Sequence, residues 1–368
     1  MMMKTRHNRG FSLIELMIAM VLGLLLSTGI FTVFSGNKQS SDLNTTMADM
    51  QENARFALNQ LSSDIRMSGF QGCKDINRGS ANILAIGAPT NNLELTSATG
   101  SVVTSPTVWS PAPPIGLARL GNVIPGTHAL TLQFGSEATF PLAESVGGDV
   151  PNRSDPILVD TTAGISSEPF NIQSGEFAII GNCVGADLIK VTSAAGGSVS
   201  HTNDDNISNS LTYDYFADRN TKLMRFNSNI YFVGDTGSTN ASGDMITGLY
   251  QQKLPYEDSN PPVLMISGVE NMRILFGART GTDTFSFLTP DDPTLRPQDI
   301  ETIRIGLLMV SEDPVNDQLD ERTYTLAGQP IIAASGGSTD AGTHPRDQRY
   351  RQAFNTTVKI RNRRDIHN

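Results

Sequence analysis

The most marked feature of the hydropathy pattern is an apolar run close to the N-terminus. Residues 16–37 form a stretch of 22 positions without a charged side chain. A helix rises about 1.5 Å per residue, so this run reaches ~33 Å, enough to cross a bilayer core of about 30 Å. The pattern therefore predicts a membrane-spanning helix segment over residues 11–36.

Helical spacing continues beyond the apolar run. After a polar hinge expected at 36–38, apolar or small residues return every three or four positions, at Leu43, Met47, Met50, Ala54, Ala57, Leu58, Leu61 and Ile65. Gly69 then supplies a C-terminal stop. The pattern predicts an amphipathic continuation of the helix over residues 37–69, with its apolar stripe packed on the chain's own globular domain. A coiled coil with another chain is the alternative, which the Ala and Met content of the stripe disfavours.

Beyond the helix the apolar residues fall into short runs separated by turn signals. These runs predict strands at 128–134, 156–159, 177–180, 187–192, 229–233, 262–266, 272–276, 302–310 and 356–360. Val269–Met272 is expected to form a short turn, and the sections 79–125 and 333–343 are expected to be loops rich in small and polar residues. The fold class is therefore α+β, a long N-terminal helix packed on a large, mainly antiparallel β domain over residues 70–368.

Charge excludes one class of partner. The chain carries 27 basic and 37 acidic residues, a net charge of −10. Nucleic-acid binding without sequence preference depends on basic side chains that neutralise phosphates, so no nucleic-acid partner is expected. The basic tail that begins at Lys359 is expected to be a solvated chain end, with contact to a partner or an anionic surface as the alternative.

The N-terminal charges set the orientation. Lys4, Arg6 and Arg9 precede the apolar run, and basic residues beside a membrane segment tend to stay cytoplasmic. The rest of the chain is then expected on the periplasmic side, where thiols are oxidised. The two cysteines, Cys73 and Cys183, are expected to form a disulfide there; a pair of buried free thiols is the alternative.

Candidate catalytic and metal-binding chemistry is sparse. The sequence has no Gly-x-Ser-x-Gly elbow, His-Glu-x-x-His, P-loop or dinucleotide fingerprint, so no enzyme activity, cofactor or metal site is predicted. The acid pairs Asp204-Asp205 and Asp291-Asp292 offer oxygen ligands suited to calcium. Pairs of this kind are more often solvated loop charges, and this is the preferred interpretation.

One acid, Glu15, lies inside the membrane segment. An ionised carboxylate there costs a few kcal/mol, which makes it a functional candidate. Cleavage between Gly10 and Phe11 would create an α-amino group four residues away, close enough to interact with Glu15. An ordinary secretory signal and a plain membrane anchor are the alternatives. The run is too long for the first, and the second leaves Glu15 and the Gly-Phe junction without a role.

The string Gly10-Phe-Ser-Leu-Ile-Glu15 resembles the class III signal of type IV prepilins and type II secretion pseudopilins. The resemblance implies that residues 1–10 are a leader, that a prepilin peptidase cleaves after Gly10 and methylates the amine of Phe11, and that Glu15 guides subunit docking into a filament. Loss of the leader would leave 24 basic residues against 37 acidic ones, a net charge of −13.

Later segments resemble PilW-type minor pilins of type IV pili. They are 51–58 with 68–70, 183–192, 268–277, 303–309 and 356–363. The resemblance implies a pilin-like fold and a non-catalytic subunit that helps to initiate pilus assembly or lies at the pilus tip. Its partners would be other minor pilins, the major pilin, the peptidase, the inner-membrane assembly platform and membrane lipid. A type II secretion minor pseudopilin and a pilus-tip adhesin are the alternative functions.

The cleavage site can be tested directly. Replacing Gly10 by leucine should leave an unprocessed precursor, because the peptidase would meet a bulky side chain at the scissile bond. Intact-mass measurement or a gel shift distinguishes precursor from product, and normal cleavage of the variant would refute the site.

Overall fold

The computed structural model describes residues 12–74, 76, 79–116, 120–143, 152–161, 170–256, 259–281, 284–335 and 342–363. The chain forms two compact units, Met1–Gln51 and Glu52–Asn368. Helix α1 (Leu13–Met67) is the one element that runs through both of them. All strands belong to the second unit.

In the first unit α1 is continuous. It passes through Gly36, Asn37 and Lys38 without a break, so the hinge expected there is absent. A helical glycine costs only about 1 kcal/mol relative to alanine, which is too little to interrupt a long hydrogen-bonded ladder. Thr28 and Thr32 also keep their hydroxyls on the helix, bonded to the carbonyls of Leu24 and Thr28 at 2.8 and 2.9 Å.

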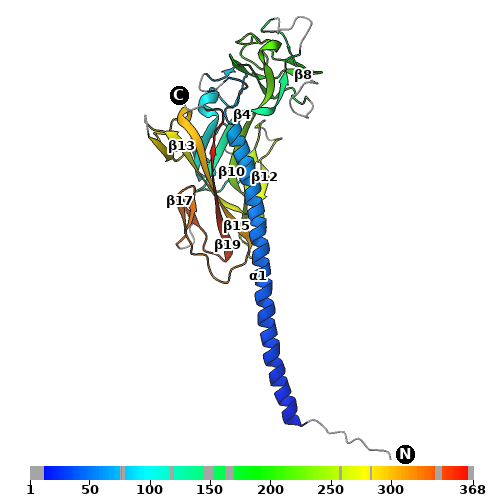
Figure 1. Ribbon diagram of the computed structural model, residues 1–368, viewed down its shortest axis with the longest axis vertical. Helices are drawn as coiled ribbons and strands as arrows, with labels where there is room; N and C mark the ends of the chain where they lie inside the picture. The colour runs from blue at the N-terminus through cyan, green and yellow to red at the C-terminus, as the bar shows by residue number, and fades with distance from the viewer. Residues whose placement is uncertain are drawn as a thin grey trace, which may run out of the picture. The chain divides into compact units, whose positions relative to one another are not determined.

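The larger sheet of the second unit has nine strands. Neighbouring strands are antiparallel except for β1 and β7, which are parallel. In spatial order the main path is β1 (Asn82–Ile83), β7 (Ala186–Lys190), β6 (Phe177–Gly181), β10 (Lys222–Thr239), β4 (His128–Pro141), β2 (Ala98–Ser105) and β3 (Val108–Ser110); β11 (Met245–Gln252) pairs with β10, and β12 (Val263–Ser267) pairs with β11. Figure 1 labels three of its members, β4, β10 and β12.

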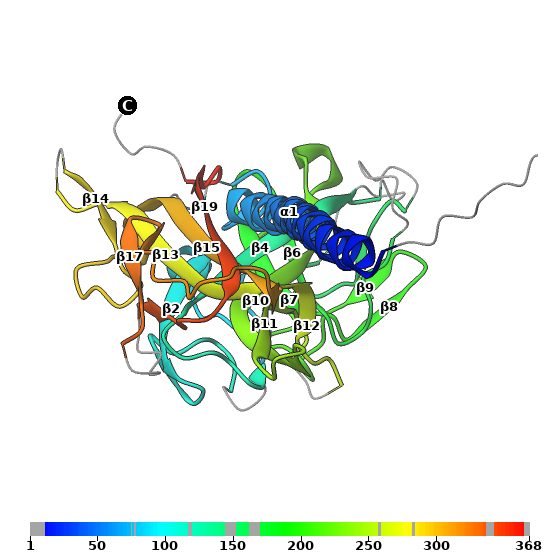
Figure 2. The same cartoon turned by 90° about the horizontal axis from the view of Figure 1, so that it is seen from below.

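The second sheet has four antiparallel strands. Their order is β14 (Phe285–Leu288), β13 (Val269–Arg279), β15 (Ile300–Pro314) and β19 (Arg349–Lys359). Figure 2 shows this sheet, yellow to red, beside the green and cyan strands of the nine-stranded sheet. The remaining elements are short: β16 (Tyr324–Leu326), β17 (Gln329–Ala333), β18 (Thr343–His344), β5 (Ile157–Leu158), β9 (Ser198–Ser200), β8 (Ser193–Ala195), α2 (Leu93–Thr96), η3 (Ala217–Arg219) and η4 (Pro297–Asp299).

The two sheets pack through β13, which lies against β4, β10 and β11. The chain passes from β12 of one sheet to β13 of the other at Gly268, where φ is +75°. A Cβ atom at this position would lie 2.8 Å from the carbonyl oxygen of Val310. Only glycine avoids both the left-handed backbone penalty and that clash, so Gly268 permits the change of sheet.

A separate lobe is built around β5, β8 and β9, near the top of Figure 1. It has its own buried core, which includes Phe140, Ile157, Ile180, Val199 and Tyr215. The chain between β4 and β10, which includes the hairpin of β6 and β7, supplies most of it. The lobe is therefore an elaboration of the nine-stranded sheet.

The α+β class and the antiparallel character of the body are confirmed. Each of the nine expected strand runs contributes to an observed strand. Two expectations were wrong: Val269–Met272 is the start of β13 and forms no turn, and the expected loop section 79–125 contains β2, a full member of the large sheet paired with β4. Part of the other expected loop, 333–343, lies outside the described residues.

Within the second unit, α1 buries one face. Ala54, Ala57, Leu61 and Ile65 are fully buried, as the apolar stripe predicted, whereas Phe56 on the opposite face is 54% exposed. Alanine at two of these positions lets the helix backbone approach its neighbours closely, and burial of the larger side chains stabilises the contact by about 2 kcal/mol each.

Asp64 fixes this helix face to the sheet. Its carboxylate is buried and accepts hydrogen bonds from Asn229 Nδ2 at 2.6 Å and from the hydroxyl of Tyr231, both on β10. Gln60 Nε2 donates a third bond at 3.2 Å, and Gln251 Nε2 on β11 donates to the Tyr231 hydroxyl at 2.6 Å. Burial, and after it the charge of Asp64, raise the pKa of Tyr231 well above its usual value, so the phenol stays a donor.

The Asp64 cluster yields a stability prediction. Asp64→Ala should lower the free energy of unfolding by about 2–4 kcal/mol, because it leaves buried donors on β10 without an acceptor. Urea unfolding of the full chain in detergent, followed by the fluorescence of Trp109, measures the change; this is the sole tryptophan and is 5% exposed.

Two further variants make the test specific. Ser63→Ala, one residue away on the exposed face of α1, should change the free energy of unfolding by less than about 0.5 kcal/mol. Tyr231→Phe combined with Asp64→Ala should cost less than the sum of the single changes, since both remove the same bond. Strict additivity would show that the two side chains do not act together.

Candidate functional site

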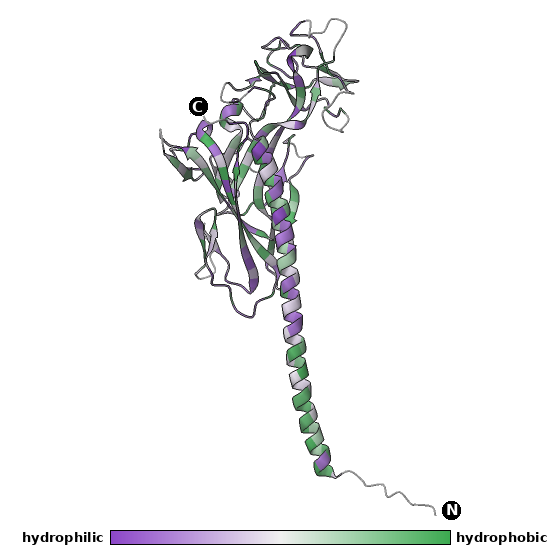
Figure 3. Cartoon of the chain, in the orientation of Figure 1, coloured by the Kyte–Doolittle hydropathy of each residue, from purple (hydrophilic) through white to green (hydrophobic). Residues whose placement is uncertain are grey.

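The first half of α1 has the properties of a membrane segment. It is long and apolar enough to cross a membrane by length and composition, with a mean hydropathy of 2.3 in its most apolar window, none of which is buried. Figure 3 shows the change along the helix, from a green apolar part to a part where purple hydrophilic residues recur. The expected membrane segment and its amphipathic continuation thus correspond to two parts of one helix.

Glu15 caps the start of this helix. Its Oε2 accepts a hydrogen bond from the backbone N–H of Ser12 at 3.0 Å, and Ser12 Oγ accepts one from the N–H of Ile14 at 3.4 Å. This is a capping-box arrangement, in which the acid in the first turn satisfies a backbone donor outside it. Among the described residues, Oε1 of Glu15 accepts no hydrogen bond, so one carboxylate oxygen is open to a further donor.

Gly10 and Phe11, the residues expected at the cleavage and methylation site, lie outside the described residues. Ser12, the first described residue, directly follows them, and α1 begins one residue later. The scissile bond expected from the sequence therefore immediately precedes the helix that carries Glu15.

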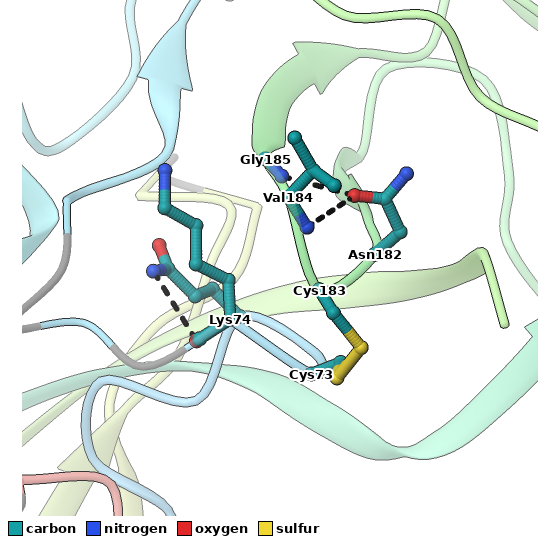
Figure 4. The surroundings of a disulfide bond; sticks show 7 residues. Cys73, Lys74, Asn182, Cys183, Val184 and Gly185 are labelled. Atoms are coloured by element: carbon teal, nitrogen blue, oxygen red, sulfur yellow. Dashed lines mark hydrogen bonds between the residues drawn. A yellow bond between two sulfur atoms is a disulfide. The ribbon is translucent and has the colours of Figure 1, made fainter. Parts of the chain in front are cut away.

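Cys73 and Cys183 form a disulfide, as expected, with their Cα atoms 4.5 Å apart (Figure 4). The bond joins the segment that follows α1 to the turn between β6 and β7, across a sequence separation of 110. Asn182 shapes that turn, because its Oδ1 accepts the N–H groups of Val184 and Gly185 at 2.8 and 2.9 Å. The chain-entropy model gives about 4–5 kcal/mol of stabilisation for a loop of this length.

The C-terminal end of α1 is capped by the far end of the chain. Asn362 Nδ2 lies 3.3, 3.1 and 3.2 Å from the carbonyl oxygens of Arg66, Met67 and Ser68. The last carbonyls of a helix have no partner within the helix, so this amide satisfies groups that would otherwise need water. Gly69 then turns the chain away with φ of +73°.

Arg363 holds that C-terminal segment in place. Its guanidinium is buried and donates to the carbonyl of Glu94 at 2.7 Å, to Ser97 Oγ at 3.0 Å and to the carbonyl of Pro297. Burial lowers its pKa to about 10. The expectation of a solvated basic tail is thus wrong for Arg363, since neutral carbonyl acceptors hold it inside the body; residues 364–368 lie outside the described part of the chain.

The acid pairs considered for calcium make ordinary loop contacts. Asp205 pairs with Lys190 at 2.9 Å, Asp204 accepts from the Thr202 hydroxyl at 2.9 Å, and Asp292 accepts from the N–H and hydroxyl of Thr294. In the described ranges, no group of three or more His, Cys, Asp or Glu side chains is placed to hold a metal ion. The structure does not bring the two pairs together into one site.

Sequence reasoning missed the residues that attach α1 to the body. Asp64, Asn229, Tyr231, Asn362 and Arg363 each have a partner distant in sequence. One signal was available: Asp64 interrupts the apolar stripe between Leu61 and Ile65, and a charge at such a position must be matched by donors from the surface it faces.

Comparison with known proteins supports a pilus-associated family. Residues 230–362 match the family described as type IV pilus-assembly protein W, and residues 5–31 match the prokaryotic N-terminal methylation motif. Among solved structures, a type IV-like pilin from Thermus thermophilus is 17% identical over 38% of this chain and 78% of its own, with a TM-score of 0.19; a likeness this weak carries no weight. No curated protein matches.

The two family matches coincide with structural features already described. The methylation motif covers the start of α1 with Glu15, and the assembly-protein region runs from the middle of β10 through the four-stranded sheet to Asn362. It contains Tyr231 and Asn362, which attach α1 to the body, and it does not include the lobe around β5, β8 and β9. The chain is thus similar over residues 230–362 to the type IV pilus-assembly protein W family, and over residues 5–31 to the prokaryotic N-terminal methylation motif.

Proposed function

We propose that this protein is a non-catalytic minor pilin that helps to initiate type IV pilus assembly, or caps the pilus, together with other minor pilins. The observation that carries the proposal is the joint presence of the N-terminal methylation motif and the type IV pilus-assembly protein W region in one chain. The second match favours a type IV pilus over the type II secretion alternative.

The proposal assigns a sequence of roles to the N-terminus. Residues 1–10 are a leader removed by the prepilin peptidase, which then methylates Phe11, and residues 11–36 hold the subunit in the inner membrane. The body, including the lobe, is placed in the periplasm and presents the surfaces that bind partner pilins. The oxidised pair Cys73 and Cys183 supports a periplasmic location, because disulfides persist in that compartment.

Glu15 has two roles in this proposal. One carboxylate oxygen caps α1 through the N–H of Ser12, and the other, which accepts no bond from a described residue, would accept a cationic donor. A methylated amine at Phe11 of a neighbouring subunit is such a donor, and in an apolar surrounding the attraction between the two charges is much stronger than in water. The same side chain would then cap the first turn of α1 and dock the subunit against its neighbour.

A deletion strain tests the function. Loss of the gene should remove most surface pili, and the wild-type gene should restore them; pili counted by electron microscopy or shear preparation give the readout. Pilus numbers that stay normal in the deletion strain would refute a role in assembly. If pili persist and only adherence is lost, the tip-adhesin alternative is correct.

Two substitutions separate the roles of Glu15 in that strain. Glu15→Gln keeps a capping side chain, since glutamine also serves in a capping box, but removes the charge. We expect this variant to be processed normally and still to fail in restoring pili. The control Glu52→Gln, an exposed acid further along α1, should restore them fully. Restoration by Glu15→Gln would show that only the cap matters.

A further inference from the structure

A cavity of about 790 Å³ lies within the second unit, where β11, β13 and β19 begin. This volume is in the range of roughly 300–1,000 Å³ that is usual for ligand pockets. Ile124, Met245 and Leu319 supply apolar walls, and Met245 and Leu319 are 48% and 54% exposed. An occupant therefore meets apolar side chains that solvent can still reach, and a small ion alone would leave most of the space empty.

The starts of β11 and β13 are held beside each other at this cavity. The N–H of Gly268, one residue before β13, donates to the carbonyl of Thr247 on β11 at 2.8 Å. Asp244 lies just before β11 and Asn271 lies near the start of β13, and both line the cavity. Two neighbouring segments thus bring a carboxylate and an amide to one cavity.

Asp244 is the charged group of the lining that lacks a counter-ion. It is partly buried, and a turn holds it in place: its Oδ2 accepts a bond from Asn240 Nδ2 at 3.1 Å, and its backbone N–H donates to Asn240 Oδ1 at 2.8 Å. Among the described residues no cation lies within ion-pair distance of this carboxylate, and its Oδ1 accepts no hydrogen bond. A negative charge with a fixed position is therefore available to a donor in the cavity.

Every other charged side chain of the lining has an opposite charge beside it. The pairs are Glu270 with Arg351 at 2.7 Å, Asp347 with Arg349 at 2.8 Å, and Arg346 with Glu321. The two arginines of the lining are thus already neutralised, and the unbalanced charge of the lining is negative. A cationic occupant would balance it, since charges shielded from water are normally paired.

Asn271 adds a second acceptor to the cavity. It is 5% exposed, and its Oδ1 has no hydrogen-bond partner. Buried side-chain amides are nearly always bonded, so an unsatisfied oxygen in a cavity wall favours an occupant that donates hydrogen bonds. A guanidinium group has five N–H donors in a planar fork and no acceptor, so it can serve this oxygen and the carboxylate of Asp244 together.

We propose that this cavity binds a peptide segment of a partner chain that carries an arginine between apolar residues. The guanidinium would pair with Asp244 and donate to Asn271, while the apolar side chains would contact Ile124, Met245 and Leu319. The site is separate from the N-terminal helix and from the residues that attach it to the body. The proposal goes beyond pilus assembly, and binding by the purified chain tests it whether or not that function holds.

The test uses the full chain in detergent and a defined probe, an acetylated, amidated pentapeptide with leucine at both ends and a central arginine between alanines. A ligand that binds only the native state raises the midpoint of thermal unfolding in a saturable way, so we expect such a rise with this peptide. Citrulline in place of the arginine keeps the shape but removes the charge, and that peptide should give a much smaller shift. Absence of a shift with the arginine peptide would overturn the proposal.

A shorter probe distinguishes a peptide from a small basic molecule. Acetylarginine amide has the guanidinium but lacks the leucines that would contact the apolar walls, so at the same concentration its shift should be smaller. A shift equal to that of the pentapeptide would show that the basic group binds alone, which contradicts the proposed peptide site.

Variants identify the residues responsible. Asp244→Asn should abolish the shift and leave the midpoint of the free protein unchanged, because asparagine can still accept the bond from Asn240. Asn271→Leu should reduce the shift without lowering that midpoint, because it removes an amide oxygen that has no partner. Asp313→Asn, at an exposed acid of β15 outside the cavity lining, should keep the full shift. A shift that survives in Asp244→Asn, or one that is lost in Asp313→Asn, would contradict the assignment.

Discussion

Asp64 sets the constraint on which the attachment of α1 depends. A carboxylate inside the body must receive hydrogen bonds, because an unpaired buried charge costs several kcal/mol. The donors are Asn229 and Tyr231, two residues apart on β10 and therefore on one face of the strand. Their fixed spacing determines both the rotation of α1 about its axis and its position along β10. A purely apolar contact between alanines and a sheet would allow the helix to slide; the carboxylate removes that freedom.

Hydrophobic patterning predicted those helices and strands whose apolar residues follow a clear period or form an unbroken run. α1 was predicted because an uninterrupted apolar run and a following stripe both obey the helical period, and β13 and β15 because their apolar residues are consecutive. β2 was missed because its sequence, Ala98–Ser105, is mostly small and polar; it becomes a strand through pairing with β4, whose strong pattern supplies the template. Tertiary pairing overrode weak local preference in that case.

The residues of the candidate site also fall into a group that the sequence predicts and a group that it does not. Glu15 was predictable because an acid inside an apolar run is a functional candidate, and the two cysteines because an oxidising compartment favours their disulfide. The bond between Glu15 and Ser12 was not predicted. The bonds of Asp64 and Asn362 connect residues 165 and 295 positions apart, and no local pattern encodes such partners. Arg363 resembled any charged tail residue in sequence, and only the surrounding carbonyls of Glu94 and Pro297 show why it is buried.

The cap that Asn362 places on α1 joins two segments that are 295 positions apart. The last carbonyls of a helix have no partner within the helix, so those of α1 depend on a segment that only the four-stranded sheet can bring into place, since Asn362 follows its strand β19. A change that unfolds β19 would therefore also be felt at the end of α1, although the two are far apart in the sequence.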